Sequence, residues 1–276
     1  MFPVEIVDNI FSHLDYHSLE ASSAAAPFLS RIAERHLYAD IALVAWYGCK
    51  DSKLPLTIAQ LSNLLSERPH IASHVFSLTI EISQSISVDQ YLEAFPAVIR
   101  LLQNLRKITI ERPHGPPYFW DEGWSKLPEN FRSSLEYSLR LPSMQELEVI
   151  GIIAIPLSFL HDCTGIEILK LQGCTISDPE LNSPHGGPLI RDLSLVDVRH
   201  SSLKRLTPWI AKSCKQLQYF RFSPYSRPER EFSLTIPPIL FSCSNALTAL
   251  DIDLVSSCRR HFSSPLSELI TKSFLS

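Results

Sequence analysis

The sequence predicts an α/β fold in which three short helices precede a solenoid of parallel strands and intervening helices. Two observations lead to this prediction. The first forty residues show the spacing of amphipathic helices, and the rest of the chain repeats one strand pattern seven times. The composition, 45% hydrophobic and 20% charged over 276 residues, is that of an ordinary globular protein. We therefore expect two domains, residues 1–40 and residues 41–276.

The first helix is predicted to begin at Pro3, because the fixed φ of proline suits the first helical position. Apolar residues then recur at helical spacing and form one broad face, made of Ile6, Val7, Ile10, Phe11 and Leu14. A second helix is expected from Leu19 to Ala26, and Pro27 is expected to open a third. A unit this small has little core of its own and usually needs a partner or a neighbouring domain.

The repeated pattern is apolar-x-x-apolar-x-apolar, the signature of a half-buried strand. Its central positions are Leu78, Ile108, Leu147, Leu169, Leu193, Phe220 and Leu250. We expect these residues to stack in one buried column, with the residue after each of them on the opposite face. Ile41–Leu43 is predicted to be a capping strand before the repeats.

Helices are predicted between several of the strands, at residues 88–104, 131–141, 206–214 and 236–244. A strand followed by a helix, repeated, implies parallel strands on a concave face with helices outside. A doubly wound α/β enzyme is the main structural alternative. It is disfavoured because the strands are short and two-faced, and because no glycine-rich phosphate loop follows any of them.

Two parts of the sequence resemble a known family. The N-terminus follows the pattern Pro3-x-Glu5-Ile6-x-x-x-Ile10-Phe11-x-x-Leu14-x-x-x-x-Leu19, which resembles the F-box of mushroom-forming fungi. The chain departs from that pattern at Phe2 and at 26–28 (Ala-Pro-Phe). The remainder resembles an irregular leucine-rich-repeat domain, and in its fourth unit Cys174 stands at the family's Asn/Cys position.

The resemblance implies a non-enzymatic adaptor that recognises substrates for an SCF-type E3 ubiquitin ligase. It assigns binding of a Skp-type linker protein, and through it a cullin, to Pro3, Ile6, Ile10, Phe11, Leu14 and Leu19. The solenoid would bind a target protein, and no catalytic residue, cofactor or metal site is expected in this chain. Two alternatives stay open. One is a repeat scaffold whose degenerate F-box recruits no ligase, and the other is an unrecognised hydrolase, suggested only by the His185-Gly186-Gly187 turn.

The charge is unevenly distributed along the chain. The net charge of −4 argues against a general nucleic-acid binder, yet residues 199–230 contain eight basic residues and one acidic residue. We expect an acidic or phosphorylated target segment to dock on this region, because arginine suits carboxylate and phosphate geometry. The residues predicted to bind it are Arg199, Tyr219, Arg221, Arg227 and Arg230. The alternative is an ordinary solvated helix face.

The remaining features predict a protein of the cytoplasm or nucleus. The six scattered cysteines form no CxxC pair, which favours reduced core thiols, and the N-terminus has no signal-peptide pattern. The longest apolar stretch is too short to span a membrane. Trp124 is expected to serve as local core, whereas Tyr118–Trp120 fit a core role and a partner-binding role equally well.

Overall fold

The computed structural model describes residues 3–44, 54–82, 94–112, 123–161, 163–177, 188–224, 228–243 and 245–253, with the backbone alone at residue 200 and residues 228–235. The chain forms two compact units. The first comprises Met1–Gly115 and Leu127–Glu146, and the second comprises Pro116–Lys126 and Leu147–Ser276. The described parts of each unit are α/β.

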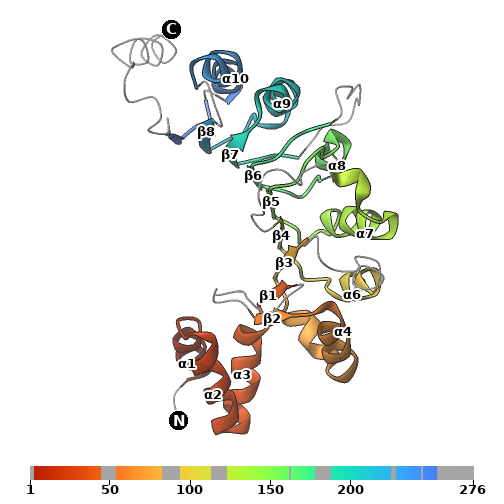
Figure 1. Ribbon diagram of the computed structural model, residues 1–276. Coiled ribbons are helices and arrows are strands. Elements are labelled where there is room, and N and C mark those ends of the chain that lie inside the picture. Colours follow the sequence, from red (N-terminus) through yellow and green to blue (C-terminus); the bar gives the residue numbers. More distant parts are fainter. Residues whose placement is uncertain are drawn as a thin grey trace. The chain divides into compact units, whose positions relative to one another are not determined.

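The first unit begins with three helices and continues as parallel strands and helices. Its elements are α1 (Val4–Phe11), α2 (Tyr16–Ala25), α3 (Pro27–Leu37), β1 (Asp40–Leu43), β2 (Leu54–Leu56), α4 (Ile58–Glu67), the 3-10 helix η1 (Pro69–His74), β3 (Ser77–Glu81), α6 (Phe95–Leu101), β4 (Lys107–Glu111) and α7 (Glu129–Leu139). The strands follow the order β2-β1-β3-β4, and every pairing is parallel. Within this unit, α4, α6 and α7 lie along one side of the strands (Figure 1).

The second unit repeats the same alternation. Its elements are the 3-10 helix η3 (Trp124–Lys126), β5 (Glu146–Ile150, whose first residue belongs to the first unit), α8 (Leu157–His161), β6 (Ile168–Gln172), β7 (Asp192–Val198), α9 (His200–Ser213), β8 (Tyr219–Pro224), α10 (Pro228–Cys243) and β9 (Ala249–Ile252). The strand order is β5-β6-β7-β8-β9, and the pairings from β6 to β9 are parallel. Helices α9 and α10 lie side by side (Figure 1).

The strand register confirms the predicted columns within each unit. Leu78 pairs with Ile108 in the first unit, and the second unit aligns Leu169, Leu193, Phe220 and Leu250. All of these are buried except Leu250, which is half-buried on β9, the last strand of the described sheet. The opposite column also holds its register, as predicted, and Thr79 and Thr109 in it are buried, each only 3% exposed.

A hydrogen-bond motif recurs at the start of the strands. The backbone carbonyl of the residue just before a strand accepts two N–H groups from the residues that open the next strand, as Phe76 does from Arg106 (2.8 Å) and Lys107 (3.0 Å). The carbonyls that behave in this way are those of Ala39, Phe76, Arg106, Glu167, Arg191 and Gln218. The strands joined by these six carbonyls are therefore aligned to each other at their first residues.

A second motif recurs at the ends of helices. A buried residue ends or follows the helix, and its carbonyl accepts the N–H of the residue three positions later, before the next strand begins. The residues in this position are Leu102, Leu141, Cys163, Cys214 and Cys243. Three of the cysteines are thus repeat-turn residues, whereas the resemblance had singled out Cys174 alone.

The predicted helices are present, but several of their bounds were wrong. Helix α9 begins at His200 rather than 206, and α10 begins at Pro228 rather than 236, although each contains proline, which costs a helix a backbone hydrogen bond. Helix α6 ends at Leu101, and residues 88–93 of that prediction lie outside the described residues. Elements β2, α4, η1 and α8 were not predicted. The predicted capping strand is β1.

Candidate partner-binding surfaces

The three N-terminal helices are bounded by local signals in the sequence. Pro3 is the N-cap of α1, with φ −54° and ψ 143°, so it precedes the helix rather than opening it as predicted. Asp15 caps α2, because its carboxylate accepts a hydrogen bond from the Ser18 N–H at 2.8 Å. Pro27 is the first residue of α3, as expected. These boundaries divide 34 residues, Val4 to Leu37, into three helices.

The helices pack around a small apolar cluster. Its buried members are Phe11, Leu19, Ile32 and Ala33, and the half-buried side chains packed on it are Val7, Leu14, Leu29 and Leu37. Three residues predicted to bind a linker protein, Phe11, Leu14 and Leu19, therefore belong to this cluster. In the structure their first role is to hold the helices together.

Other apolar side chains of these helices face solvent. Ile6 is 48% exposed and Ile10 is 52% exposed, and Pro3 is exposed at the start of the same helix. Because Ile6 and Ile10 are four residues apart, they lie on one face of α1. Two further residues that the sequence analysis did not select are equally open, Val4 at 57% and Phe28 at 50%. Each directly follows a proline at a helix start, which is the sequence signal that could have found them.

The basic segment of the second unit does not form one patch in the described residues. Arg221 extends from β8, and its Nε lies 3.4 Å from Asp251 Oδ2 on β9. The Tyr219 hydroxyl donates to the same carboxylate oxygen at 3.4 Å. Arg199 is exposed at the N-cap of α9. Asp251, which was not among the predicted site residues, thus already neutralises part of the predicted site.

The rest of the basic segment is divided between other roles. Lys204, Lys212 and Lys215 are exposed on or just after α9, which fits a solvated helix face. Arg205 instead donates to the backbone carbonyls of Ile176 (2.6 Å) and Ser177 (2.9 Å). Arg227 lies outside the described residues, and of Arg230 only the backbone, in α10, is described.

The described thiols are poor nucleophiles. Cys163, Cys174, Cys214 and Cys243 are free and buried. Burial raises the pKa of Cys174 to about 11. Burial and the neighbouring Cys243 raise the pKa of Cys214 to about 12. A thiol must lose its proton to attack a substrate or bind a metal, so these environments favour a structural role.

Other predicted features have mixed outcomes. Trp124 is local core, as expected, 3% exposed with its ring centroid 4.3 Å from that of Phe159. Tyr118–Trp120 and the His185–Gly187 turn lie outside the described residues. In the described part of the chain, no group of three or more His, Cys, Asp or Glu side chains could hold a metal ion. No helix among the described residues is both long enough and apolar enough to cross a bilayer.

The candidate surfaces are therefore the exposed apolar side chains of α1 and α3 and the Arg221–Asp251 region of β8 and β9. In comparisons with known proteins, no family model matches the chain and no curated protein matches it.

Proposed function

We propose that the protein is a substrate-recognition adaptor of an SCF-type E3 ubiquitin ligase. In this proposal α1 to α3 are an F-box that binds a Skp-type linker protein and through it a cullin. The strands and helices that follow are an irregular leucine-rich-repeat solenoid that binds a target protein. The observation that carries the proposal is the set of exposed apolar side chains on the N-terminal helices, namely Val4, Ile6, Ile10 and Phe28.

These exposed side chains are available to a partner, because they are not members of the apolar cluster that packs the helices together. The apolar cluster of the helices is formed by other residues, and about half of each exposed side chain still faces water. A large aliphatic side chain gains roughly 1.5–3 kcal/mol when a partner buries it fully. Ile6 and Ile10, one turn apart on α1, supply the paired anchors with which an amphipathic helix typically enters an apolar groove.

The repeats suit the second half of the proposal. Strands β6 to β9 present alternate side chains on the face away from the buried column, and stacked strands combine these into an extended surface. Four buried free cysteines fit a reducing compartment, and we place the protein in the cytoplasm or nucleus. An acidic or phosphorylated target segment would compete with Asp251 for the guanidinium of Arg221.

The test is co-expression with a fungal Skp-type linker protein, followed by size-exclusion chromatography. We expect the wild type to co-elute with the linker and Ile10→Asp to lose co-elution, because a buried unpaired carboxylate opposes docking. The half-exposed position of Ile10 allows the variant to fold, which circular dichroism checks. Asn63→Asp adds the same charge at an exposed position of α4 and should co-elute like the wild type.

A folded wild type that fails to co-elute would contradict the proposal. The chain would then be better explained as a repeat scaffold whose F-box, altered at 26–28, recruits no ligase. Co-elution of Ile10→Asp at the wild-type level would instead show that the exposed face of α1 is not the docking surface.

A further inference from the structure

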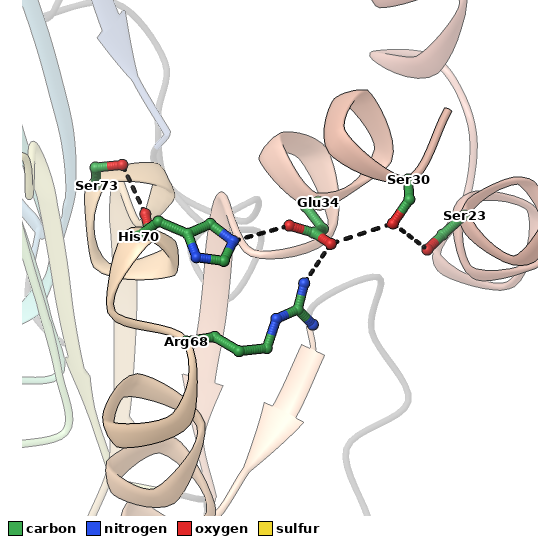
Figure 2. Close-up of polar contacts among 6 residues, drawn as sticks. All are labelled: Ser23, Ser30, Glu34, Arg68, His70 and Ser73. Carbon is green, nitrogen blue, oxygen red and sulfur yellow. Dashed lines mark hydrogen bonds and ion pairs between the residues drawn. The ribbon is translucent and has the colours of Figure 1, made fainter. Parts of the chain in front are cut away.

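A polar cluster centred on Glu34 joins the N-terminal helices to the first repeat. Glu34 lies in α3, and its side chain is only 12% exposed. Oε1 accepts hydrogen bonds from Arg68 and from Ser30 (3.2 Å), and Oε2 lies 3.1 Å from Nε2 of His70. Ser30 in turn accepts a hydrogen bond from Ser23 of α2 at 3.4 Å. Figure 2 shows these contacts converging on one carboxylate.

The two basic partners of Glu34 come from one fixed corner of the repeat. Arg68 is the C-cap of α4, where its N–H donates to the Leu64 carbonyl at 2.8 Å, and His70 lies two residues further on, in η1. The Arg68 carbonyl accepts the N–H of Ile71, a fully buried residue, at 3.1 Å. The Arg68 guanidinium also lies 6.0 Å from the centroid of the Tyr38 ring, just beyond the end of α3. Arg68 is therefore held by its own backbone hydrogen bonds, and the His70 carbonyl accepts the Ser73 hydroxyl at 2.7 Å.

The apolar cluster of the N-terminal helices does not extend into the α4–η1 corner. Every member of the cluster within the N-terminal helices lies between Val7 and Leu37, and none belongs to α4 or η1. Between α3 and β1 the chain itself has only Tyr38 and Ala39, and the Ala39 carbonyl accepts the N–H groups of Phe76 and Ser77. The Glu34 cluster forms a second connection beside it, from α3 to the α4–η1 corner.

The charge of Glu34 is maintained in this setting. Burial alone would raise the pKa of Glu34, but hydrogen bonds from His70 and Arg68, together with the charge of Arg68, hold that pKa below its ordinary value. A largely buried carboxylate depends on its partners, because losing them leaves an uncompensated charge. Exposed ion pairs contribute little, but a carboxylate with this burial and three donors is not an ordinary surface pair.

We propose that Glu34 is a positioning residue that latches α3 to the α4–η1 corner and fixes the direction in which the three helices leave the first repeat. The latch does not depend on the proposed function. Its role in presenting a target rests on that function: if the helices bind a ligase and the repeats bind a target, Glu34 sets the orientation of the target relative to the ligase. The contacts of Glu34 thus fix the angle between the three helices and the first repeat.

The experiment measures that angle as a distance between two spin labels. Labels are placed at exposed positions with Glu20→Cys on α2 and Asn63→Cys on α4. Cys49 and Cys258 are replaced by serine, and the four described cysteines are buried. Double electron–electron resonance then compares the parent, Glu34→Gln and the matched control Glu67→Gln. Glu67 is an exposed carboxylate next to Arg68 on α4.

We expect a narrow distance distribution for the parent and for Glu67→Gln, and a clearly broadened one for Glu34→Gln. Amide exchange in η1 should also accelerate roughly tenfold or more in Glu34→Gln, the effect of losing charge-assisted hydrogen bonds. A distribution for Glu34→Gln as narrow as that of the parent overturns the latch, as does a broad distribution in the parent.

A second variant decides the case in which Glu34→Gln unfolds the helices. Arg68→Gln removes the ion pair from the α4 side, and Arg68 is not part of the apolar cluster of the helices. A broadened distribution for Arg68→Gln supports the latch, and a narrow one overturns it. Co-elution with the linker protein is measured on the same samples. If the parent itself does not co-elute, the proposed function fails while the spin-label result still decides the latch.

Discussion

Gly123 occupies a position that no larger residue fits, and the reason is a neighbouring backbone. A Cβ built on Gly123 would lie 2.9 Å from the Ile153 carbonyl oxygen and 3.2 Å from the Ala154 Cβ. The next residue, Trp124, donates its N–H to that same carbonyl at 2.8 Å and packs its ring on Phe159. We predict that Gly123→Ala displaces Trp124 and lowers the free energy of unfolding by roughly 1–3 kcal/mol, as overpacking does. Urea unfolding followed by tryptophan fluorescence measures the effect.

The control at this scale is Ser125→Ala, an exposed position two residues further on, which should leave the unfolding curve unchanged. If Gly123→Ala unfolds at the wild-type urea concentration, the Ile153 carbonyl has moved aside and the close approach is not required. The sequence could predict that Trp124 is local core, because lone loop aromatics often are. It could not predict the partner, since Phe159 lies 35 residues away and the contact depends on the fold.

Helix α4 is stabilised by hydrogen bonds of the residues at its N-terminus. Thr57 accepts the N–H of Gln60 at 3.2 Å, and the Gln60 side chain accepts the Thr57 N–H at 2.8 Å, a complete capping box. We predict that Thr57→Ala costs about 1 kcal/mol of stability, while Thr57→Ser retains the cap and stays within a few tenths of the wild type. Denaturant unfolding compares the two variants. Equal losses for alanine and serine would mean that the Thr57 methyl group, rather than its hydroxyl, stabilises the helix.

The same helix was missed in the sequence analysis although its signal is present there. The Thr57-x-x-Gln60 spacing marks a helix start, but no helix was predicted between the capping strand and the first repeat. The strands themselves were predictable because apolar residues alternate in each of them. The N-terminal ends of α9 and α10 were not predictable. Proline inside a helix locally disfavours the helix, and here the packing of α9 against α10 compensates for that cost.

At the scale of the whole molecule, buried thiols lower the stability of the protein as the pH rises into the alkaline range. Cys214 has an ordinary pKa of 9.0 that burial and Cys243 raise to about 12, so the folded protein keeps a proton that the unfolded chain releases. Stability is therefore complete below pH 9 and declines as the pH rises from there toward the pKa of the folded protein. We predict that the free energy of unfolding falls between pH 8 and pH 10, by less in Cys214→Ala than in the wild type. Urea titrations at pH 8, 9 and 10 supply the comparison.

Parallel pH curves for the two proteins would show that Cys214 ionises equally well in both states. The sequence could predict reduced core cysteines, and the structure places four of them there. It could not predict the surface chemistry of the basic segment. Arg221 meets Asp251 only because β8 and β9 pair in register, and residues thirty positions apart show no such relation in one sequence.

The carbonyl that accepts two N–H groups at each strand start has a consequence for how such a chain can change over generations. The acceptor carbonyl and its first N–H donor are separated by between 24 residues, for Glu167 and Arg191, and 39 residues, for Arg106 and Gln145, yet each carbonyl accepts the same two hydrogen bonds. Alignment is thus restored at every turn by one backbone atom, whatever length of chain has intervened. We therefore expect insertions and deletions in the exposed loops of these segments to leave the ladder intact. Surface loops can therefore change in length during evolution while the ladder of strands stays the same. Peptides inserted into those loops should be tolerated for the same reason.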